Sequence, residues 1–338
     1  MVAETLLAPF PHFGGKSRIA AEVWDRLGSD CTNFVDPFAG SAAFLMAAPD
    51  IPIRTINDAD GFIANFWRAV ANDPAAVAQY VDWPVIEADL FARHVWLIKQ
   101  RDALIERLHA DPDYYDAKIA GWWCWGACAW IGSGWCSGEG PWSVEDGAIV
   151  NLRGNAGRGV NRQLPHLGNA GRGVNRKLPH LGDAGKGERS AIAAHLFDYM
   201  HALSDKLRRT RVTCGDWTRV VQPSVTFRHG VTAVILDPPY GEGEVEYSAG
   251  GNGTSHIAAD VWAWALANGD NPLLRIAVCG YADGRVTPPG WAVMRWKARK
   301  GYQVENTNPR RETVWFSPHC RPERAPMMFD LFAEETAS

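Results

Sequence analysis

The motif DPPY at residues 237–240 places a carboxylate, a proline-stiffened backbone and an aromatic ring within four positions. It follows the apolar run 234–236, which is typical of a buried strand. Because ligands bind at the carboxyl ends of strands in open α/β sheets, we expect a ligand here. Asp237 and the carbonyl of Pro238 can accept both N–H bonds of an amine on a planar ring, and Tyr240 can stack on that ring. Held in this way, the amine would aim its lone pair at an electrophile. An ordinary turn after a strand is the alternative.

A second constellation lies near the N-terminus, where DPFAGSA at 36–42 is predicted to form a strand-to-helix turn. Gly40 allows a ligand to approach the backbone closely, and the N-terminus of the following helix favours a carboxylate or a phosphate. Asp58 lies eighteen residues beyond Gly40, near the spacing at which an acid binds ribose hydroxyls in dinucleotide folds. The pattern G-x-G-x-x-G is absent, which disfavours a nicotinamide cofactor. An ordinary turn between strand and helix is again the alternative.

Two further patterns fall short of known binding signatures. FGGKS at 13–17 resembles part of a phosphate-binding loop, but Phe10 stands where that loop needs its first glycine, so ATP hydrolysis is disfavoured. Cys124, Cys128 and Cys136 have a spacing atypical of zinc sites, and a fourth ligand is not evident. We therefore expect no metal.

The elements that must position these groups alternate between strands and helices. Short apolar runs before Asp36 and Asp58 predict strands, and apolar residues spaced by three to four after Asp58 predict a helix. This βαβ pattern implies a parallel sheet. Helical patterns follow over about 76–120 and 191–208, and four more runs predict strands: VTCGDW, TAVILDPPY, RIAVCGY and TVWFSP. The pattern predicts an α/β fold with a mostly parallel, doubly wound sheet that an insertion interrupts.

The insertion has an unusual composition. Six Trp residues fall within 122–142, and we interpret most of this cluster as a buried helix that packs the insertion onto the sheet, with base stacking as the alternative. The segment GNAGRGVNRQLPHL at 154–167 recurs at 168–181 with one difference, and a partial copy, GDAGKG, begins at 182. Gly and Asn at this density indicate a loop rather than a helix or a packed strand.

The charge distribution singles out two basic segments in a chain of net charge −4. Residues 151–189 contain eight Lys and Arg against two acids, and residues 295–311 contain six against Glu305 alone. Basic loops beside the expected active edge would neutralise phosphates and position a duplex. A solvated surface loop without a partner is the alternative reading of the repeat.

The overall composition, 46% hydrophobic and 21% charged, is that of a globular protein. An uninterrupted apolar run of about eighteen residues and a signal peptide are not evident, so we expect no membrane partner. Seven scattered Cys are consistent with reduced thiols. We expect a cytoplasmic protein.

Four segments in this order, PFPHFGGKSRIA, DPFAGSAAFL, INDAD and ILDPPY, resemble the motifs of the Dam-type (D12 class) adenine-specific DNA methyltransferases. The resemblance is closest to the phage and prophage methylases of that class, which implies a bacterial or phage-infected cell. It implies a Rossmann-like S-adenosylmethionine-dependent methyltransferase sheet. The catalytic domain would be discontinuous, and the expected divisions are 1–75 and 205–320 for that domain, 76–204 for a target-recognition insertion with the repeat at 154–187, and 321–338 for a C-terminal tail.

The resemblance also implies roles for individual residues. One departure from the family pattern is Ala42, which replaces the second Gly of the usual F-x-G-x-G loop. The flipped base would be held by Asp237, Pro238 and Tyr240, with Pro239 shaping the turn. The implied S-adenosylmethionine contacts are Phe13, Gly14, Gly15, Lys16, Asp36, Phe38, Gly40, Asp58, Asp216 and Trp217. The DNA contacts that we predict are Lys16, Arg153, Arg158, Arg162, Arg172, Arg176, Lys177, Arg299, Lys300, Arg310 and Arg311.

The implied activity is transfer of a methyl group from S-adenosylmethionine to the N6 amine of adenine in double-stranded DNA, with base flipping and without an obligatory protein partner. Cytosine N4 is the nearest rival, because the same groups would hold either exocyclic amine. Protein glutamine is a further rival, but the enzymes that modify it resemble this chain at an N-P-P-Y, whereas Asp237 occupies the first position here. A DNA-binding protein that is catalytically idle on the same scaffold is the remaining alternative.

Overall fold

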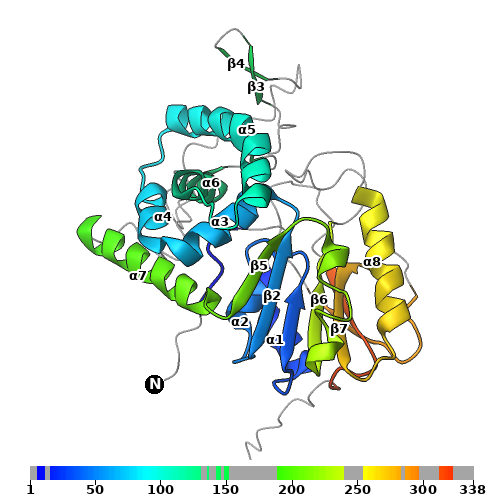
Figure 1. The fold of residues 1–338 in the computed structure, drawn as a ribbon. Helices are drawn as coiled ribbons and strands as arrows, with labels where there is room; N and C mark the ends of the chain where they lie inside the picture. The colour runs from blue at the N-terminus through cyan, green and yellow to red at the C-terminus, as the bar shows by residue number, and fades with distance from the viewer. Residues whose placement is uncertain are drawn as a thin grey trace, which may run out of the picture.

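A computed structural model describes residues 6–11, 16–130, 135–136, 142–145, 148–151, 189–239, 254–282, 286–296 and 312–322. Its centre is a seven-stranded sheet with the order β5-β2-β1-β6-β7-β9-β8 (Figure 1). The strands from β5 to β7 run parallel, whereas β9 is antiparallel to both of its neighbours. The strand bounds are Asn33–Asp36 (β1), Ile53–Asp58 (β2), Thr210–Cys214 (β5), Thr232–Leu236 (β6), Leu274–Tyr281 (β7), Ala292–Arg295 (β8) and Glu312–Phe316 (β9). The predicted mostly parallel α/β sheet is confirmed.

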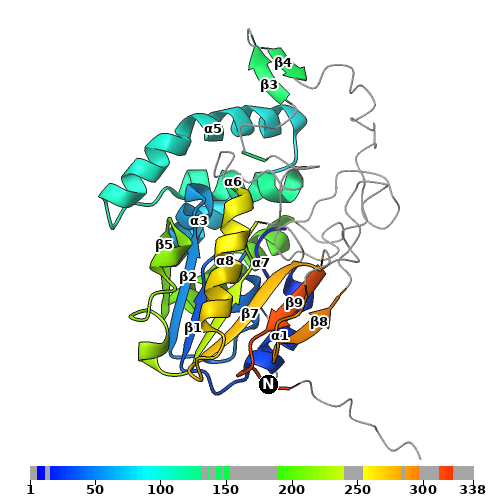
Figure 2. The same cartoon turned by 90° about the vertical axis from the view of Figure 1, so that its right-hand side faces the viewer.

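The strands at the centre of the sheet are apolar because both of their faces are covered. Every residue of β6 is buried, and successive side chains point to opposite faces. Ile235 joins the core on the face of α1 (Ala20–Leu27), whereas Val234 packs in the core under α8 (Thr254–Asn268). Figure 2 shows α8 over the sheet and β8 beyond β9 at its edge.

The strand order reverses between β1 and β6, since the chain proceeds from β1 to β2 on one side and from β6 to β7 on the other. Such a reversal leaves a crevice at the carboxyl ends of the strands, where ligands bind. The register brings Val35 opposite Val234 and Asp58 opposite Cys214. The turns that follow β1, β2, β5 and β6 therefore meet at one edge of the sheet.

A group of helices stands beyond that edge, above the sheet in Figure 1. The stretch over 76–120, which was predicted to be helical, is divided among three helices with two breaks between them. Pro84 and Pro112 lie in the two breaks, and proline removes a backbone donor and clashes with the preceding turn. The helices of this group are α3 (Gly61–Asn72), α4 (Pro74–Val81), α5 (Glu87–Ala110), α6 (Ala117–Ala129) and α7 (Arg189–Leu207). The short helix α2 (Ala43–Ala47) follows β1.

The Trp cluster is largely part of the core of this helical group. Trp123 and Trp125 on α6 are buried, which confirms their interpretation as core residues. The guanidinium of Arg93 lies 4.4 Å from the ring centroid of Trp125 and 4.6 Å from that of Trp122. The Cβ that a larger residue would have at Gly126 meets the ring of Trp135, so α6 and that ring require glycine for their close approach.

Other parts of the insertion differ from the expectation or lie outside the described residues. A short antiparallel pair, β3 (Trp142–Glu145) and β4 (Ala148–Asn151), was not predicted. The repeat at 154–187 lies outside the described residues, as do positions 323–338 of the expected tail. Within the described chain, no helix is both long and apolar enough to cross a membrane.

Candidate active site

Asp36 is the last residue of β1 and begins the first turn of the site. Its Oδ1 accepts a hydrogen bond from the backbone N–H of Phe38 at 3.3 Å. Its Oδ2 is buried and has no hydrogen-bond partner among the described residues. Burial, reinforced by the charge of Asp237, raises the pKa of Asp36 well above its ordinary value. An acceptor is therefore held at the edge of the crevice with one oxygen unsatisfied.

The turn after Asp36 has a left-handed backbone at two positions. Gly40 has φ +48°, and Ala42, the residue before α2, has φ +52°. Glycine adopts this region freely, whereas an L-alanine pays about 1 kcal/mol or more to do so. The position where this chain departs from the family loop is thus one where the backbone favours the missing glycine.

Asp58 ends β2 and is oriented by two backbone donors. Its Oδ2 accepts the N–H of Gly40 at 2.9 Å, and its Oδ1 accepts the N–H of Asp60 at 2.9 Å. The side chain of Asp60 in turn accepts from the N–H of Phe62 at the start of α3. Burial and the neighbouring Asp58 raise the pKa of Asp60 to about 7. Asp58 therefore ties the turn after β1 to the end of β2 and keeps a carboxylate at the crevice.

Asn57, in β2, links two of the turns, and the sequence analysis did not single it out. Its Nδ2 donates to the carbonyls of Pro37 at 3.0 Å and Gly215 at 2.9 Å. Its Oδ1 accepts from the hydroxyl of Thr213 at 2.8 Å. One buried amide thus connects the turn after β1 with the turn after β5. Its position beside Asp58 in INDAD was the only signal in the sequence.

Trp217 and Phe38 form an aromatic pair beside these turns. Their ring centroids are 5.9 Å apart with an interplanar angle of 34°. Trp217 begins a short 3₁₀ helix, and Asp216 caps it by accepting from the N–H of Thr218 at 2.9 Å. The two rings reach the site from β1 and β5, which lie on either side of β2.

Asp237 directly follows β6, and Lys16 lies against it. The Nζ of Lys16 is 3.2 Å from Asp237 Oδ1 and 3.5 Å from Glu312 Oε2. The three side chains are 6%, 15% and 5% exposed, respectively. Lys16 lies in a short 3₁₀ helix (Lys16–Arg18) before α1, and Glu312 is the first residue of β9. One ammonium is therefore shared by two carboxylates in a water-poor setting.

The charges of this cluster act on one another. Burial alone would lower the pKa of Lys16, but Asp237 and Glu312 hold it above its ordinary value. Burial raises the pKa of Glu312 to about 7, and Lys16 partly opposes that rise. The ammonium thus stays charged, whereas Glu312 changes its charge near neutral pH. The sequence indicated Glu312 only as an acid at the start of the apolar run TVWFSP.

The structure brings together at this edge the described residues that the sequence singled out: Lys16, Asp36, Phe38, Gly40, Asp58, Asp216, Trp217, Asp237, Pro238 and Pro239. Pro238 is buried and Pro239 partly so. The remaining candidates lie outside the described residues: Phe13, Gly14, Gly15, Tyr240, Arg153, Arg158, Arg162, Arg172, Arg176, Lys177, Arg299, Lys300, Arg310 and Arg311. Among the described residues, no cluster of three or more His, Cys, Asp and Glu could hold a metal.

A comparison of the sequence with models of protein families finds one family that matches part of the chain. Residues 12–105 match the model of the D12 class N6 adenine-specific DNA methyltransferases. The matched segment includes Lys16, the turn at 36–42 and Asp58, whereas Asp237 and Glu312 lie beyond it. A search of curated proteins finds no match. Over these residues, less than half of its length, the chain is therefore similar to the D12 class N6 adenine-specific DNA methyltransferases, enzymes that transfer a methyl group from S-adenosylmethionine to the N6 amine of adenine in DNA.

Proposed function

We propose that this chain methylates adenine N6 in double-stranded DNA after flipping the base into a site built on Asp237, Pro238 and Tyr240. The observation that carries the proposal is the buried contact of Lys16 with Asp237, at 3.2 Å. It fixes a carboxylate at the carboxyl end of β6, beside the point where the strand order reverses. The mechanism has to supply little beyond position and exclusion of water, because the methyl donor is already activated.

The described residues fit S-adenosylmethionine in their chemistry. The unsatisfied Oδ2 of Asp36 can accept from the ammonium of the methionine end. Asp58, which two backbone donors orient, presents a carboxylate that can accept from ribose hydroxyls. Phe38 and Trp217 offer apolar ring surface beside the same turns. When bound, the cofactor supplies a methyl group on a sulfonium, which is a good leaving group.

The chain's own residues would then bind and orient the target amine. Asp237 and the carbonyl of Pro238 accept the two N–H bonds of N6, and Tyr240 stacks on the base. As the N6–methyl bond forms, the amine must lose one proton, and the Asp237 carboxylate is the acceptor already in contact with it. Lys16 holds that carboxylate in one orientation through an ion pair from which water is largely excluded.

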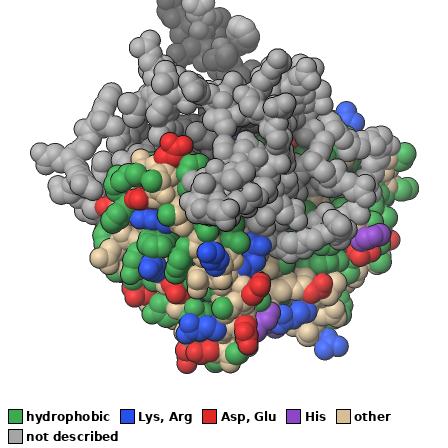
Figure 3. All heavy atoms as spheres, turned by 90° about the horizontal axis from the view of Figure 1, so that it is seen from above, with side chains coloured by type: hydrophobic (Ala, Val, Ile, Leu, Met, Phe, Trp, Pro, Cys, Tyr) green, Lys and Arg blue, Asp and Glu red, His purple; other side chains and the backbone are tan. Residues whose placement is uncertain are grey.

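DNA binding would involve the insertion 76–204 and the basic segments. An amine stacked inside a duplex is out of reach, so the base must leave the stack to be methylated. The basic segments 151–189 and 295–311 would neutralise phosphates and set the register of the protein on the duplex. The helices beyond the sheet edge stand on the side from which DNA would approach the site (Figure 1). In the view from above, acidic and basic side chains are interspersed on the described part of this face (Figure 3).

A nucleoside digest tests the proposal. The purified chain is incubated with unmethylated duplex DNA and labelled S-adenosylmethionine, and the labelled nucleoside is identified by mass after hydrolysis. N6-methyladenine is the expected product, and Asp237→Ala provides the control without the proposed acceptor. N4-methylcytosine would keep the site and overturn the base assignment. Cofactor binding without any labelled nucleoside would favour the idle scaffold.

A further inference from the structure

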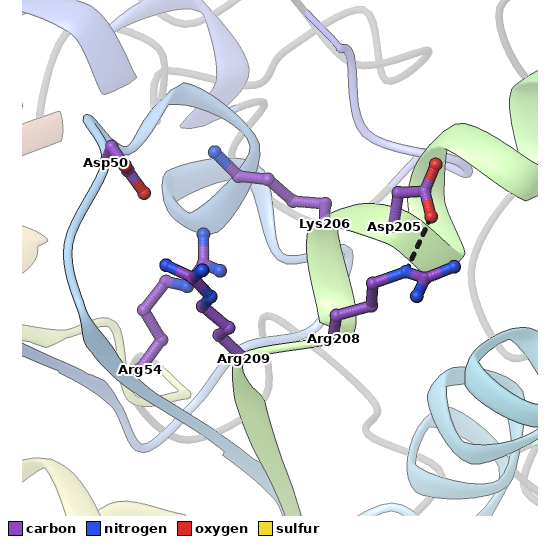
Figure 4. Close-up of a pocket in the computed structure, with 6 residues that line it drawn as sticks. All are labelled: Asp50, Arg54, Asp205, Lys206, Arg208 and Arg209. Atoms are coloured by element: carbon purple, nitrogen blue, oxygen red, sulfur yellow. Dashed lines mark hydrogen bonds and ion pairs between the residues drawn. The ribbon is translucent and has the colours of Figure 1, made fainter.

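A second charged site lies at the opposite end of the strands from the catalytic crevice. A pocket of about 420 Å³ is lined by Asp50, Arg54, Asp205, Lys206, Arg208 and Arg209 (Figure 4). Arg54 is the second residue of β2, and Asp58 at the crevice is the last. At about 3.3 Å per residue, four residues along a strand separate the two sites by roughly 13 Å of backbone. The pocket is therefore distinct from the methyl-transfer site.

The pocket carries more positive than negative charge. Four Lys and Arg side chains line it against two carboxylates. Arg208 is paired with Asp205 at 2.8 Å, but both side chains are mostly exposed. Within the described parts of the chain, Arg54, Lys206 and Arg209 have no carboxylate within ion-pair distance, and Lys206 donates to the carbonyl of Ala48 at 3.0 Å. The carboxylate of Asp50, which also lines the pocket, acts on Arg54 and Lys206 without forming an ion pair with either. These three cations therefore exceed the negative charge that faces them.

Arg54 is the unusual member of this group. Its side chain is 6% exposed, and its Nε is buried without a hydrogen-bond partner among the described residues. Figure 4 shows its guanidinium beside that of Arg209. Burial lowers the pKa of Arg54; Asp50 partly opposes this shift, and the charge of Arg209 adds to it. Burial and the charge of Arg54 likewise lower the pKa of Lys206. An unpaired buried cation beside a like charge is unfavourable unless an anion compensates it.

The C-terminus of α7 accounts for only part of the cluster. Lys206 lies in the last turn of that helix, where cations interact favourably with the helix dipole. Arg54 belongs to β2, so the dipole of α7 does not explain its position in the pocket. Its convergence with Arg209 is a property of the pocket rather than of the helix end.

We propose that this pocket binds a phosphate group, held by the guanidinium groups of Arg54 and Arg209 and the ammonium of Lys206. Planar guanidinium forks match phosphate oxygens, and an ammonium adds a point charge. The phosphate belongs either to a small phosphorylated ligand or to a DNA backbone that passes this edge of the sheet.

Calorimetric titration of the full chain with inorganic pyrophosphate at low salt tests this proposal. We expect saturable binding that Arg209→Gln weakens by about tenfold or more, since a lost charge-assisted hydrogen bond is worth about that factor. Arg54→Gln is the second variant, and its folding is checked by circular dichroism. Arg228→Gln, an exposed position that does not line the pocket, is the matched control and should bind like the wild type. Absent binding to the wild type, or equal binding by Arg209→Gln, would overturn the proposal.

A DNA arm identifies the source of the phosphate. Fluorescence anisotropy with a labelled duplex is measured for the wild type and for Arg209→Gln, with and without pyrophosphate. A lower duplex affinity in the variant, together with competition by pyrophosphate, assigns the phosphate to the DNA backbone. An unchanged duplex affinity, with pyrophosphate binding lost in the variant, assigns the site to a small phosphorylated ligand.

Discussion

Lys16 and Asp237 form a buried ion pair in which Nζ lies 3.2 Å from Oδ1, and the same ammonium lies 3.5 Å from Glu312 Oε2. The three residues come from the start of the chain, the end of β6 and the start of β9. Breaking a buried pair leaves one charge without compensation, so each partner fixes the others. The proposed acceptor of the target amine is therefore held by residues far from it in sequence.

Replacing Asp237 should impair methyl transfer without impairing cofactor binding. Asp237→Ala should abolish turnover, and Asp237→Asn should lower it by at least about a hundredfold, the usual worth of a positioned acid or base. Both variants should retain cofactor binding, because Asp36 and Asp58 are untouched. Labelled methyl transfer and calorimetry measure the two properties. Methylation at the wild-type rate by Asp237→Ala would remove the assignment.

Replacing Glu312 tests the shared ammonium. Glu312→Gln keeps the shape of the side chain but removes one of the two carboxylates that contact the ammonium of Lys16. We therefore expect kcat to fall while the cofactor affinity is kept. Because the pKa of Glu312 is about 7, the wild-type kcat should show an inflection near pH 7 that the variant lacks. A variant with the wild-type kcat and the same pH profile would contradict this.

The raised pKa of Glu312 should also make the stability of the protein depend on pH. Folding raises the pKa of Glu312 from 4.5 to about 7, so its favourable contribution is present below the unfolded value and is lost as pH rises through about 7. The free energy of unfolding of the wild type should fall relative to Glu312→Gln between about pH 4 and 8, by at most about 3 kcal/mol. Urea denaturation at several pH values measures this, with the exposed Glu106→Gln as the control.

Asp36 should couple cofactor binding to proton release. Burial and Asp237 raise the pKa of Asp36, so the empty site favours its protonated form. An ammonium at its unsatisfied Oδ2 would favour the carboxylate and expel the proton. Calorimetry of S-adenosylmethionine binding in buffers of different ionisation enthalpy should show this release. Asp36→Asn should bind more weakly and lose the coupling, whereas buffer-independent heats in the wild type would refute it.

The strands that carry the site could be predicted because each is a local pattern. The apolar runs before Asp36, Asp58 and Asp237 are β1, β2 and β6 in the structure, and the turn at 36–42 lies between β1 and α2, as its residues indicate. Local patterning suffices when a strand is buried on both faces.

The contacts between these elements could not be predicted in the same way. Lys16 and Glu312 are 296 positions apart, and no spacing rule connects an N-terminal Lys with an acid in the last strand. The role of Asn57 could not be predicted either, because it depends on the turns after β1 and β5, whose carbonyls accept its hydrogen bonds. The edge strand β8, in which Met294 alone is buried and Arg295 is exposed, has no strong apolar pattern.

Ala42 should tolerate glycine but not valine. Ala42→Gly relieves a left-handed backbone worth about 1 kcal/mol and removes a buried methyl group worth about the same. The free energy of unfolding should therefore change by less than about 1 kcal/mol, with cofactor affinity retained. Ala42→Val adds two methyl groups in a fully buried position with an unfavourable φ, and should cost about 2 kcal/mol or more. Urea denaturation compares them, and an equally stable Ala42→Val would contradict the reasoning.

The repeat should contribute to DNA affinity through its charge. Deleting 168–181 removes Arg172, Arg176 and Lys177 and leaves the nearly identical first copy in place. If all three cations contact phosphates, the slope of log affinity against log salt should decrease in magnitude by about 3. Anisotropy with a labelled duplex over a salt series measures the slope.

A triple substitution of the same residues by Gln separates charge from length. Because it keeps every residue of the loop, it should reproduce the flatter salt dependence of the deletion if charge is the cause. A change in the deletion alone would point to the length of the loop. An unchanged slope in both would mean that the second copy does not touch the backbone, since released counterions are the source of the salt dependence.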